Sequence, residues 1–256
     1  IKIPNDLRTT FYNEESIELL SKLNIWSDLK KSDYTHVKKI QVFGKKNATP
    51  LIWDNSKKDK NFGAVVKNKV MLDSIFSKLN DIKKYENFVT NTTCDNFERT
   101  LYLNDKHYVK TNLVLCADGK NSQLRKLLLI KTILKKTGHI AISGFLEQSK
   151  DHKLTATQAF TELGPIGLLP FENKNKINFV LSVEETKYKN ILSKNNPEEY
   201  ICEKLENFFS NLNLNFKPIK KINNLNNNLS SWPLDLNFII NPTANRAMLI
   251  GDAAHS

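Results

Sequence analysis

Glycine is scarce in this 256-residue chain, and its copies are widely spaced. Only eight glycines are present and no two lie one residue apart, so the sequence contains no G-x-G-x-x-G turn. A dinucleotide-binding sheet uses that turn to bring backbone amides close to a pyrophosphate. If the chain contributes to such a sheet, we expect the first strand and its glycine-rich turn to lie outside these residues.

Arginine is also scarce, although the net charge is +11. Of the 38 basic residues, 34 are lysine and four are arginine, and asparagine adds 32 residues. Surfaces that recognise phosphates favour the planar guanidinium group, so this composition argues against a nucleic-acid partner. A non-catalytic basic binding module remains an alternative, which steeply salt-dependent retention on heparin or RNA would support.

Cysteines and long apolar runs are few. The three cysteines are far apart and form no metal-binding spacing with the five histidines, so we expect no metal site and a reducing compartment. No apolar stretch approaches the length of about 18 residues that a membrane span needs. The sequence has neither an H-E-x-x-H motif nor a nucleophile elbow, and it identifies no catalytic residue.

The last eleven residues, 246–256, form the most informative segment that is present. An apolar run predicts a buried strand that ends at Gly251 and Asp252 and continues into Ala253. Glycine lets the backbone approach a ligand, and an aspartate at a strand tip can accept hydrogen bonds from ribose hydroxyls. Small residues then allow a helix to begin close to the sheet. This pattern is typical of a nucleotide site at the carboxyl end of a parallel strand.

A second strand, predicted at 113–117, also ends in an aspartate and a glycine. Asp118 and Gly119 follow this apolar run, and Ser122 is placed to cap a short helix that contains Arg125. An aspartate–glycine pair after a strand is by itself an ordinary turn signal. Together with Asp252, however, it predicts two strand tips that face one ligand from the same edge of a sheet.

The remaining pattern predicts a mixed chain of helices and strands. We expect helices at 13–24, 69–80, 122–129 and 197–212, strands at 36–43, 51–53, 139–147, 156–162 and 177–184, a hairpin of 99–103 with 107–109, and an asparagine-rich loop at 223–228.

Several segments resemble the FAD-dependent aromatic hydroxylases, and within them the ubiquinone-biosynthesis hydroxylase group. The family's A-D-G-x-x-S-x-x-R and R-x-x-L-I-G-D-A-A-H segments match residues 117–125 and 246–255. An early D-x-R followed by L-x-I-W, and a later F-x-x-x-G-P-x-x-L-L-P, match residues 6–26 and 160–170. The segment 177–183 lacks the tryptophan common in the ubiquinone group, and this departure weakens the substrate assignment more than the fold assignment.

The resemblance implies a set of cofactor-binding residues. Asp252 would hold ribityl or ribose hydroxyls of FAD, flanked by Gly251 and Ala253. Asp118 and Gly119 would lie near the pyrophosphate and the nicotinamide approach. The implied roles of the remaining candidates are a flavin contact for Arg8, a brace of the turn for Arg125, and a frame for the substrate pocket for Gly164, Pro165, Leu169 and Pro170.

The implied fold is α/β with mixed α+β character: an incomplete Rossmann-like FAD-binding sheet with an inserted, mainly antiparallel substrate domain. We expect residues 1–35, 61–138 and 241–256 in the first domain and 36–60 and 139–240 in the second. Because the glycine turn and the helix after Asp252 are not among these residues, we expect a fragment truncated at both ends that alone binds FAD weakly or not at all.

The implied activity is hydroxylation of an aromatic ring with FAD, NAD(P)H and O2, in ubiquinone biosynthesis. The substrate would be an aromatic, polyprenylated small molecule, and the protein would be cytoplasmic and peripheral to the inner membrane or to a biosynthetic complex. A polyprenyl reductase or a halogenase of the same architecture is the alternative within the flavoproteins.

Overall fold

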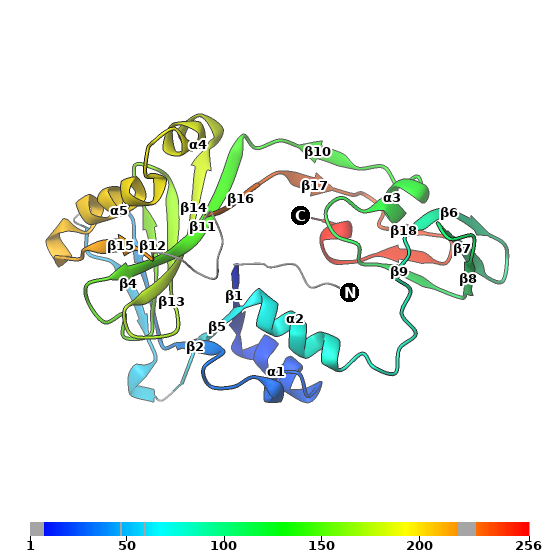
Figure 1. Cartoon of the computed structure of the whole chain (residues 1–256), viewed down its shortest axis with the longest axis horizontal. Helices are drawn as coiled ribbons and strands as arrows, with labels where there is room; N and C mark the ends of the chain where they lie inside the picture. The colour runs from blue at the N-terminus through cyan, green and yellow to red at the C-terminus, as the bar shows by residue number, and fades with distance from the viewer. Residues whose placement is uncertain (1–7, 47, 59, 220–228, 256) are drawn as a thin grey trace. The chain divides into compact units, whose positions relative to one another are not determined.

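The computed structural model describes residues 8–46, 48–58, 60–219 and 229–255. The chain divides into two compact units (Figure 1). Unit 1 comprises Lys83–Gly138 and Leu234–Ser256, and unit 2 comprises Lys2–Ile82 and His139–Pro233. These compact units group 2–35 and 61–82 with the inserted sheet. The predicted FAD-binding and substrate-binding domains are defined by the ligand that each would bind, and compactness does not test such a division. These two domains therefore stay a prediction. The expected loop at 223–228 lies outside the described residues.

An eight-stranded sheet forms the centre of unit 2. Its strands follow the order β15-β11-β14-β13-β12-β3-β4, β16 also pairs with β11, and every pairing is antiparallel except that of β12 with β3. The strands are β3 (Lys39–Phe43), β4 (Leu51–Asp54), β11 (His139–Gln148), β12 (Thr155–Phe160), β13 (Pro165–Pro170), β14 (Lys176–Glu184), β15 (Phe216–Pro218) and β16 (Ser230–Pro233).

Two helices pack on one face of this sheet, α4 (Glu185–Leu192) and α5 (Pro197–Phe208), and a 3-10 turn η3 (Ser210–Leu212) follows them (Figure 1). Helix α5 begins at a proline, which is well suited to a first helical position. It buries Ile201, Leu205 and Phe208 against sheet residues such as Phe179. The helix predicted at 197–212 is shorter in the structure, because the α-helix ends at Phe208 and Ser210–Leu212 continue as a 3-10 turn.

A smaller sheet of unit 2 has the order β1-β5-β2 and carries two further helices. Its elements are β1 (Thr9–Asn13), α1 (Glu14–Lys22), η1 (Trp26–Asp28), β2 (Tyr34–Val37), η2 (Ser56–Lys58, beside β4), β5 (Gly63–Lys67) and α2 (Asn68–Ser77). The predicted cap of the first helix is confirmed, because the Asn13 side chain accepts a hydrogen bond from the Ser16 backbone N–H.

The single strand predicted at 36–43 is wrong, since the chain changes sheets within it. Val37 pairs with Gly63 in the smaller sheet, whereas Lys39 pairs with Thr155 in the larger one. Between them, the Lys38 N–H donates to Leu154 O. A continuous apolar pattern does not reveal such a switch, because both halves are strands. The strand β13 is not predicted from the sequence, because its two prolines and its glycine are typical of turns.

Unit 1 contains three small sheets and one short helix. The sheets have the orders β18-β19-β9, β6-β7-β8 and β10-β17. Their elements are β6 (Val89–Cys94), β7 (Arg99–Leu103), β8 (Tyr108–Thr111), β9 (Val114–Cys116), α3 (Gln123–Leu127), β10 (Ile133–Lys135), β17 (Leu236–Phe238), β18 (Thr243–Ala244), β19 (Ala247–Leu249) and η4 (Gly251–Ala253). The predicted hairpin corresponds to β7 and β8, which pair antiparallel.

Within the described residues, the strand β9 is covered on one face only. Val114 and Cys116 are buried, whereas Leu115 is 57% exposed and Met248 of the neighbouring strand is 42% exposed. Within the described ranges, no helix combines the length and the apolar character that a bilayer crossing requires.

Candidate functional site

The two aspartate-bearing turns of unit 1 lie at the same end of two adjacent strands. β9 and β19 pair in parallel, with Leu249 opposite Cys116. The Ile250 N–H donates to Cys116 O at 3.0 Å, which extends the pairing to the point where both strands end. Because parallel strands end at the same edge, the turns that contain Asp118 and Asp252 follow from one edge of the sheet.

The Asp118 carboxylate is used locally, in the turn and the helix start that follow it. Its Oδ1 accepts a hydrogen bond from Ser122 Oγ at 2.6 Å, and its Oδ2 accepts from the Leu124 N–H at 3.1 Å. Burial raises the pKa of Asp118, but hydrogen bonds from the Ser122 hydroxyl and from several backbone N–H groups together outweigh burial and leave the pKa below its usual value. Ser122 Oγ in turn accepts from the Arg125 N–H at 3.0 Å, which confirms the predicted helix cap.

The Arg125 side chain connects the two turns. It is only 7% exposed. Its Nη2 donates to Lys120 O at 2.8 Å, in the turn after β9, and its Nη1 donates to Ala253 O at 2.9 Å, in the turn after β19. A buried guanidinium is stable only where its donors are satisfied, and these carbonyl groups also need a partner. Arg125 therefore holds the two turns in a common arrangement.

The Asp252 turn is arranged differently from the Asp118 turn. Residues Gly251–Ala253 form a 3-10 turn in which the N–H groups of Ala254 and His255 donate to Gly251 O. Ala253 is fully buried, whereas Asp252 is exposed. Within the described part of the chain, the Asp252 carboxylate has no hydrogen-bond or ion-pair partner. This carboxylate is free to accept hydrogen bonds from a ligand.

The glycines of both turns leave room for a ligand to approach the backbone. Gly119 has φ +81° and Gly251 has φ +58°, conformations that glycine adopts without strain. A Cβ atom built at either position would meet nothing within 4 Å among the described atoms. Open backbone beside a free carboxylate suits a ligand with hydroxyl and phosphate groups. These residues fit the part of FAD that the sequence resemblance assigns to them.

Two further arginines clamp the same region through backbone carbonyls, and sequence reasoning gave no role to one of them. Arg99 is 6% exposed and donates twice to Asn245 O, at 3.0 and 2.6 Å. Arg246 donates to Asn96 O at 2.6 Å and to Asn112 O at 3.3 Å. Arg99 lies in no recognisable motif. Its sequence signal is the rarity of arginine in a lysine-rich chain, and its burial in the structure marks it as a structural residue. The guanidinium groups of unit 1 thus fix the loops around β9 and β19.

Arg8 lies in unit 2, just before β1. Its guanidinium lies over the Trp232 ring, 5.5 Å from the ring centroid, and its backbone O accepts from the Asn68 N–H at 3.0 Å. Its neighbours therefore belong to the N-terminal sheet and to β16. The proposed flavin contact of Arg8 stays a prediction.

The four residues predicted to frame a substrate pocket form part of the hairpin β12–β13 in unit 2. A Cβ on Gly164, which has φ +142°, would lie 2.1 Å from Ser182 O, so close strand packing alone requires glycine there. Pro165 begins β13, Pro170 ends it, and Leu169 packs on the cluster around Phe145. None of the four lines the cavity of about 620 Å³ found in this unit. Their substrate role stays a prediction.

Metal binding has no geometric support in the described ranges, where no cluster of three or more histidine, cysteine or acidic side chains is placed to hold an ion.

The chain is similar in sequence to curated ubiquinone-biosynthesis enzymes. It is 22% identical over 288 residues to "Ubiquinone biosynthesis monooxygenase COQ6, mitochondrial" of Drosophila melanogaster, covering 98% of the chain and 59% of the relative. It is 23% identical to the protein of the same name in Dictyostelium discoideum, covering 98% and 61%. The chain thus spans about 60% of the length of these relatives. No family model matches it.

Solved structures with a similar fold include a monooxygenase, a protein in complex with FAD and a flavin-dependent halogenase. p-Nitrophenol 4-monooxygenase PnpA from Pseudomonas putida DLL-E4 matches with a TM-score of 0.70 and 12% identity, over 99% of this chain and 65% of that chain. HpxO of Klebsiella pneumoniae, in complex with FAD and uric acid, gives 0.68 and 14%, over 100% and 66%. The flavin-dependent halogenase CmlS gives 0.70 and 15%, over 98% and 47%. These matches establish the fold.

The fold predicted from the sequence is confirmed, as a mixed α/β chain with a fold similar to those of the monooxygenase PnpA and of HpxO, which was solved with FAD bound. In sequence and in fold, this chain therefore resembles the flavoprotein monooxygenases and, among them, the ubiquinone-biosynthesis group.

Proposed function

We propose that this chain carries part of the FAD site of a flavin-dependent monooxygenase that hydroxylates an aromatic ring. The observation that supports this most directly is the parallel pair β9–β19, which brings the Asp118 and Asp252 turns to one sheet edge. The bridge from Arg125 to both turns makes them one structural unit. The similarity to curated monooxygenases favours hydroxylation among flavin chemistries.

The residues divide between contact with FAD and support of that contact. Asp252 would accept hydrogen bonds from hydroxyl groups of FAD, because its carboxylate is exposed and free within the described residues. Gly251 and Gly119 would let the cofactor approach their backbone, since no described atom occupies that space. Asp118 and Arg125 would keep the turns in place. When bound, FAD supplies the redox chemistry that transfers an oxygen atom from O2.

The finer parts of the proposal concern the donor and the substrate. We propose NAD(P)H as electron donor and a polyprenylated aromatic ring as substrate, because the sequence resemblance implies both. The curated relatives are named only as monooxygenases of ubiquinone biosynthesis. Because a polyprenyl chain resides in a membrane, the protein would work at a lipid surface or within a biosynthetic complex. The excess of lysine suits anionic lipid. A cytoplasmic protein peripheral to the inner membrane fits this arrangement.

Reduction of a polyprenyl double bond and halogenation are the alternatives within this fold. The similarity of fold to CmlS keeps halogenation open, because fold alone does not determine chemistry. The three reactions give different products. A hydroxylase adds one oxygen atom from O2, a reductase adds two hydrogens, and a halogenase requires halide.

The test uses the open reading frame that contains these residues, expressed and supplied with FAD, NADH or NADPH, and a polyprenylated phenol under ¹⁸O2. We expect a product heavier by one ¹⁸O atom, detected by mass spectrometry, with turnover that stops without O2. A product heavier by two hydrogens only, or one formed only with halide, would replace the hydroxylase by its alternative. Absence of flavin binding together with salt-dependent retention on heparin would favour the basic binding module instead.

A further inference from the structure

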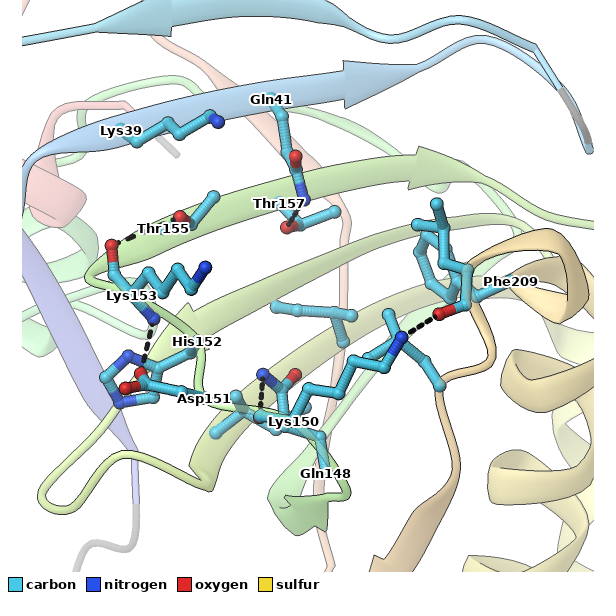
Figure 2. Close-up of a pocket in the computed structure, with 14 residues that line it drawn as sticks. Lys39, Gln41, Gln148, Lys150, Asp151, His152, Lys153, Thr155, Thr157 and Phe209 are labelled. Atoms are coloured by element: carbon cyan, nitrogen blue, oxygen red, sulfur yellow. Dashed lines mark hydrogen bonds between the residues drawn. The ribbon is translucent and has the colours of Figure 1, made fainter.

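Unit 2 contains a cavity that the proposed flavin chemistry does not use. It has a volume of about 620 Å³ and is lined by residues of the neighbouring strands β3, β12, β13 and β14, of the loop after β11 and of the segment after α5 (Figure 2). Small-molecule sites in proteins usually enclose about 300–1,000 Å³. The cavity is therefore large enough for a small organic ligand.

One wall of the cavity is apolar. Leu168, Ile177 and Phe209 line it and are each less than 5% exposed overall, because their other sides pack into the core beneath α5. Leu212 and Leu214 continue this wall from the segment after α5. Such a surface favours the apolar part of a ligand over water.

Cationic side chains enter the cavity from two other segments. Lys39 comes from β3, whereas Lys150 and Lys153 come from the loop after β11 (Figure 2). Three lysines and one acidic residue, Asp151, line the cavity. The positive charge of the lining thus exceeds its negative charge, even when Asp54, the ion-pair partner of Lys39, is included. This balance favours an anion over a cation.

Two of these lysines have capacity to bind an anion. The Lys150 Nζ donates to Leu212 O at 2.6 Å and so secures the apolar segment. The Lys39 Nζ forms an ion pair with the Asp54 carboxylate at 3.9 Å, which is longer than a hydrogen bond and leaves its N–H donors available. The Lys153 ammonium has no partner among the residues that the structure describes. Gln41 and Thr157, joined by a 2.8 Å hydrogen bond, add polar groups to the lining.

We propose that this cavity binds a small amphipathic anion, an apolar chain or ring that carries one carboxylate or phosphate group. The apolar part lies against the wall of Leu168, Ile177, Phe209, Leu212 and Leu214, of which Leu212 is 40% exposed, and the anionic group lies beside Lys39 and Lys153. The cavity belongs wholly to unit 2, and none of the residues predicted to bind FAD or to frame the substrate pocket lines it.

The test is titration of the chain with four probes by isothermal calorimetry. Decanoate and decyl phosphate carry both parts of the proposed ligand, decanol lacks the charge, and acetate lacks the apolar chain. We expect saturable one-site binding of decanoate or decyl phosphate, with decanol and acetate at least about tenfold weaker. The tighter of the two anions identifies the headgroup.

Matched lysine variants locate the site. Lys39→Gln and Lys153→Gln should each weaken binding about fivefold, and the double variant more. Lys189→Gln, which removes the same charge from an exposed ion pair on α4, should leave binding unchanged. Circular dichroism verifies that every variant is folded, and Lys39 and Lys153 serve as independent tests should one variant fail.

Three results would overturn the proposal: no saturable binding of either anion, equal binding of decanol and decanoate, or equal weakening by Lys189→Gln and Lys153→Gln. Each of these outcomes would leave the flavin proposal untouched, because that proposal rests on residues of unit 1.

Discussion

The Asp118 and Asp252 turns look alike in sequence, but their structures differ in what the carboxylate does. Asp118 accepts hydrogen bonds from Ser122 and Leu124 and thereby stabilises its own turn. Asp252 is exposed and has no partner within the described residues. The difference teaches that a strand-end aspartate can position a site or contact a ligand. Only its local hydrogen bonds distinguish the two roles.

The largest expected effect comes from removing the bridge between the two turns. Arg125→Ala leaves Lys120 O and Ala253 O without their donor and opens space at a buried site. We expect the free energy of unfolding to fall by about 3 kcal/mol, measured by chemical denaturation of the chain.

Arg125→Lys serves as the matched control for this prediction. Lysine keeps the charge but has no planar fork to reach two carbonyls, so it should recover only part of the loss. A loss below about 0.5 kcal/mol for Arg125→Ala, the range of ordinary surface changes, would show that the turns are held by other contacts.

The second effect concerns the ligand and should separate the two aspartates. Asp252→Asn should change the free energy of unfolding by less than about 0.5 kcal/mol, because no described group bonds its carboxylate. It should weaken FAD binding by the open reading frame that contains this chain at least about tenfold, since charge-assisted acceptors are strong.

Flavin fluorescence during titration measures that affinity. Asp235→Asn, at an aspartate of the same unit outside both turns, provides the comparison and should leave the affinity unchanged. Unchanged FAD affinity in Asp252→Asn would remove this residue from the proposed site.

The third effect concerns stability, which the Asp252 substitution should leave nearly unchanged. Asp118→Ala deletes the acceptor of Ser122 Oγ and of the Leu124 N–H, so we expect a loss of about 1 kcal/mol in the free energy of unfolding. Thermal unfolding of the chain, followed by circular dichroism, measures it. A variant as stable as the original chain would contradict the supporting role and make the two aspartates equivalent.

The smallest effect is a dependence on pH. Because the pKa of Asp118 is lowered in the folded chain, its contribution to stability is present above the unfolded pKa and is lost as the pH falls through the folded value. The stability difference between the original chain and Asp118→Asn should therefore shrink between neutral and strongly acidic pH. A difference that stays constant or grows on acidification would reverse the assigned sign.

Local sequence signals predicted much of the fold. The caps at Asn13 and Ser122 are confirmed, because each side chain bonds a backbone N–H three residues away. The apolar run at 113–117 predicted β9, because a short run of consecutive apolar residues is typical of a buried strand. The switch of sheets at Lys38 was not predictable, because it depends on a bond to Leu154, more than one hundred residues further along the chain.

The candidate site was predictable in its residues but not in their division of labour. The motif pointed to Arg125, yet its bond to Ala253 joins positions 128 residues apart. Arg99 carried no motif at all, although it clamps Asn245. The lysine-lined cavity was likewise not predictable from the sequence. Lysines are common throughout the chain, and only folding brings Lys39 and Lys153 into the lining of one cavity.

The sequence by itself determined the strand β9, the helix starts capped by Asn13 and Ser122 and the two turns that carry Asp118 and Asp252, since each depends on neighbours a few residues away. Tertiary structure alone decided that β9 and β19 are parallel neighbours, that Arg125 joins their turns, and that one carboxylate is occupied while the other is free. The physical reason is that a hydrogen-bond donor satisfies whichever acceptor the fold brings within about 3 Å, and sequence distance does not limit that choice.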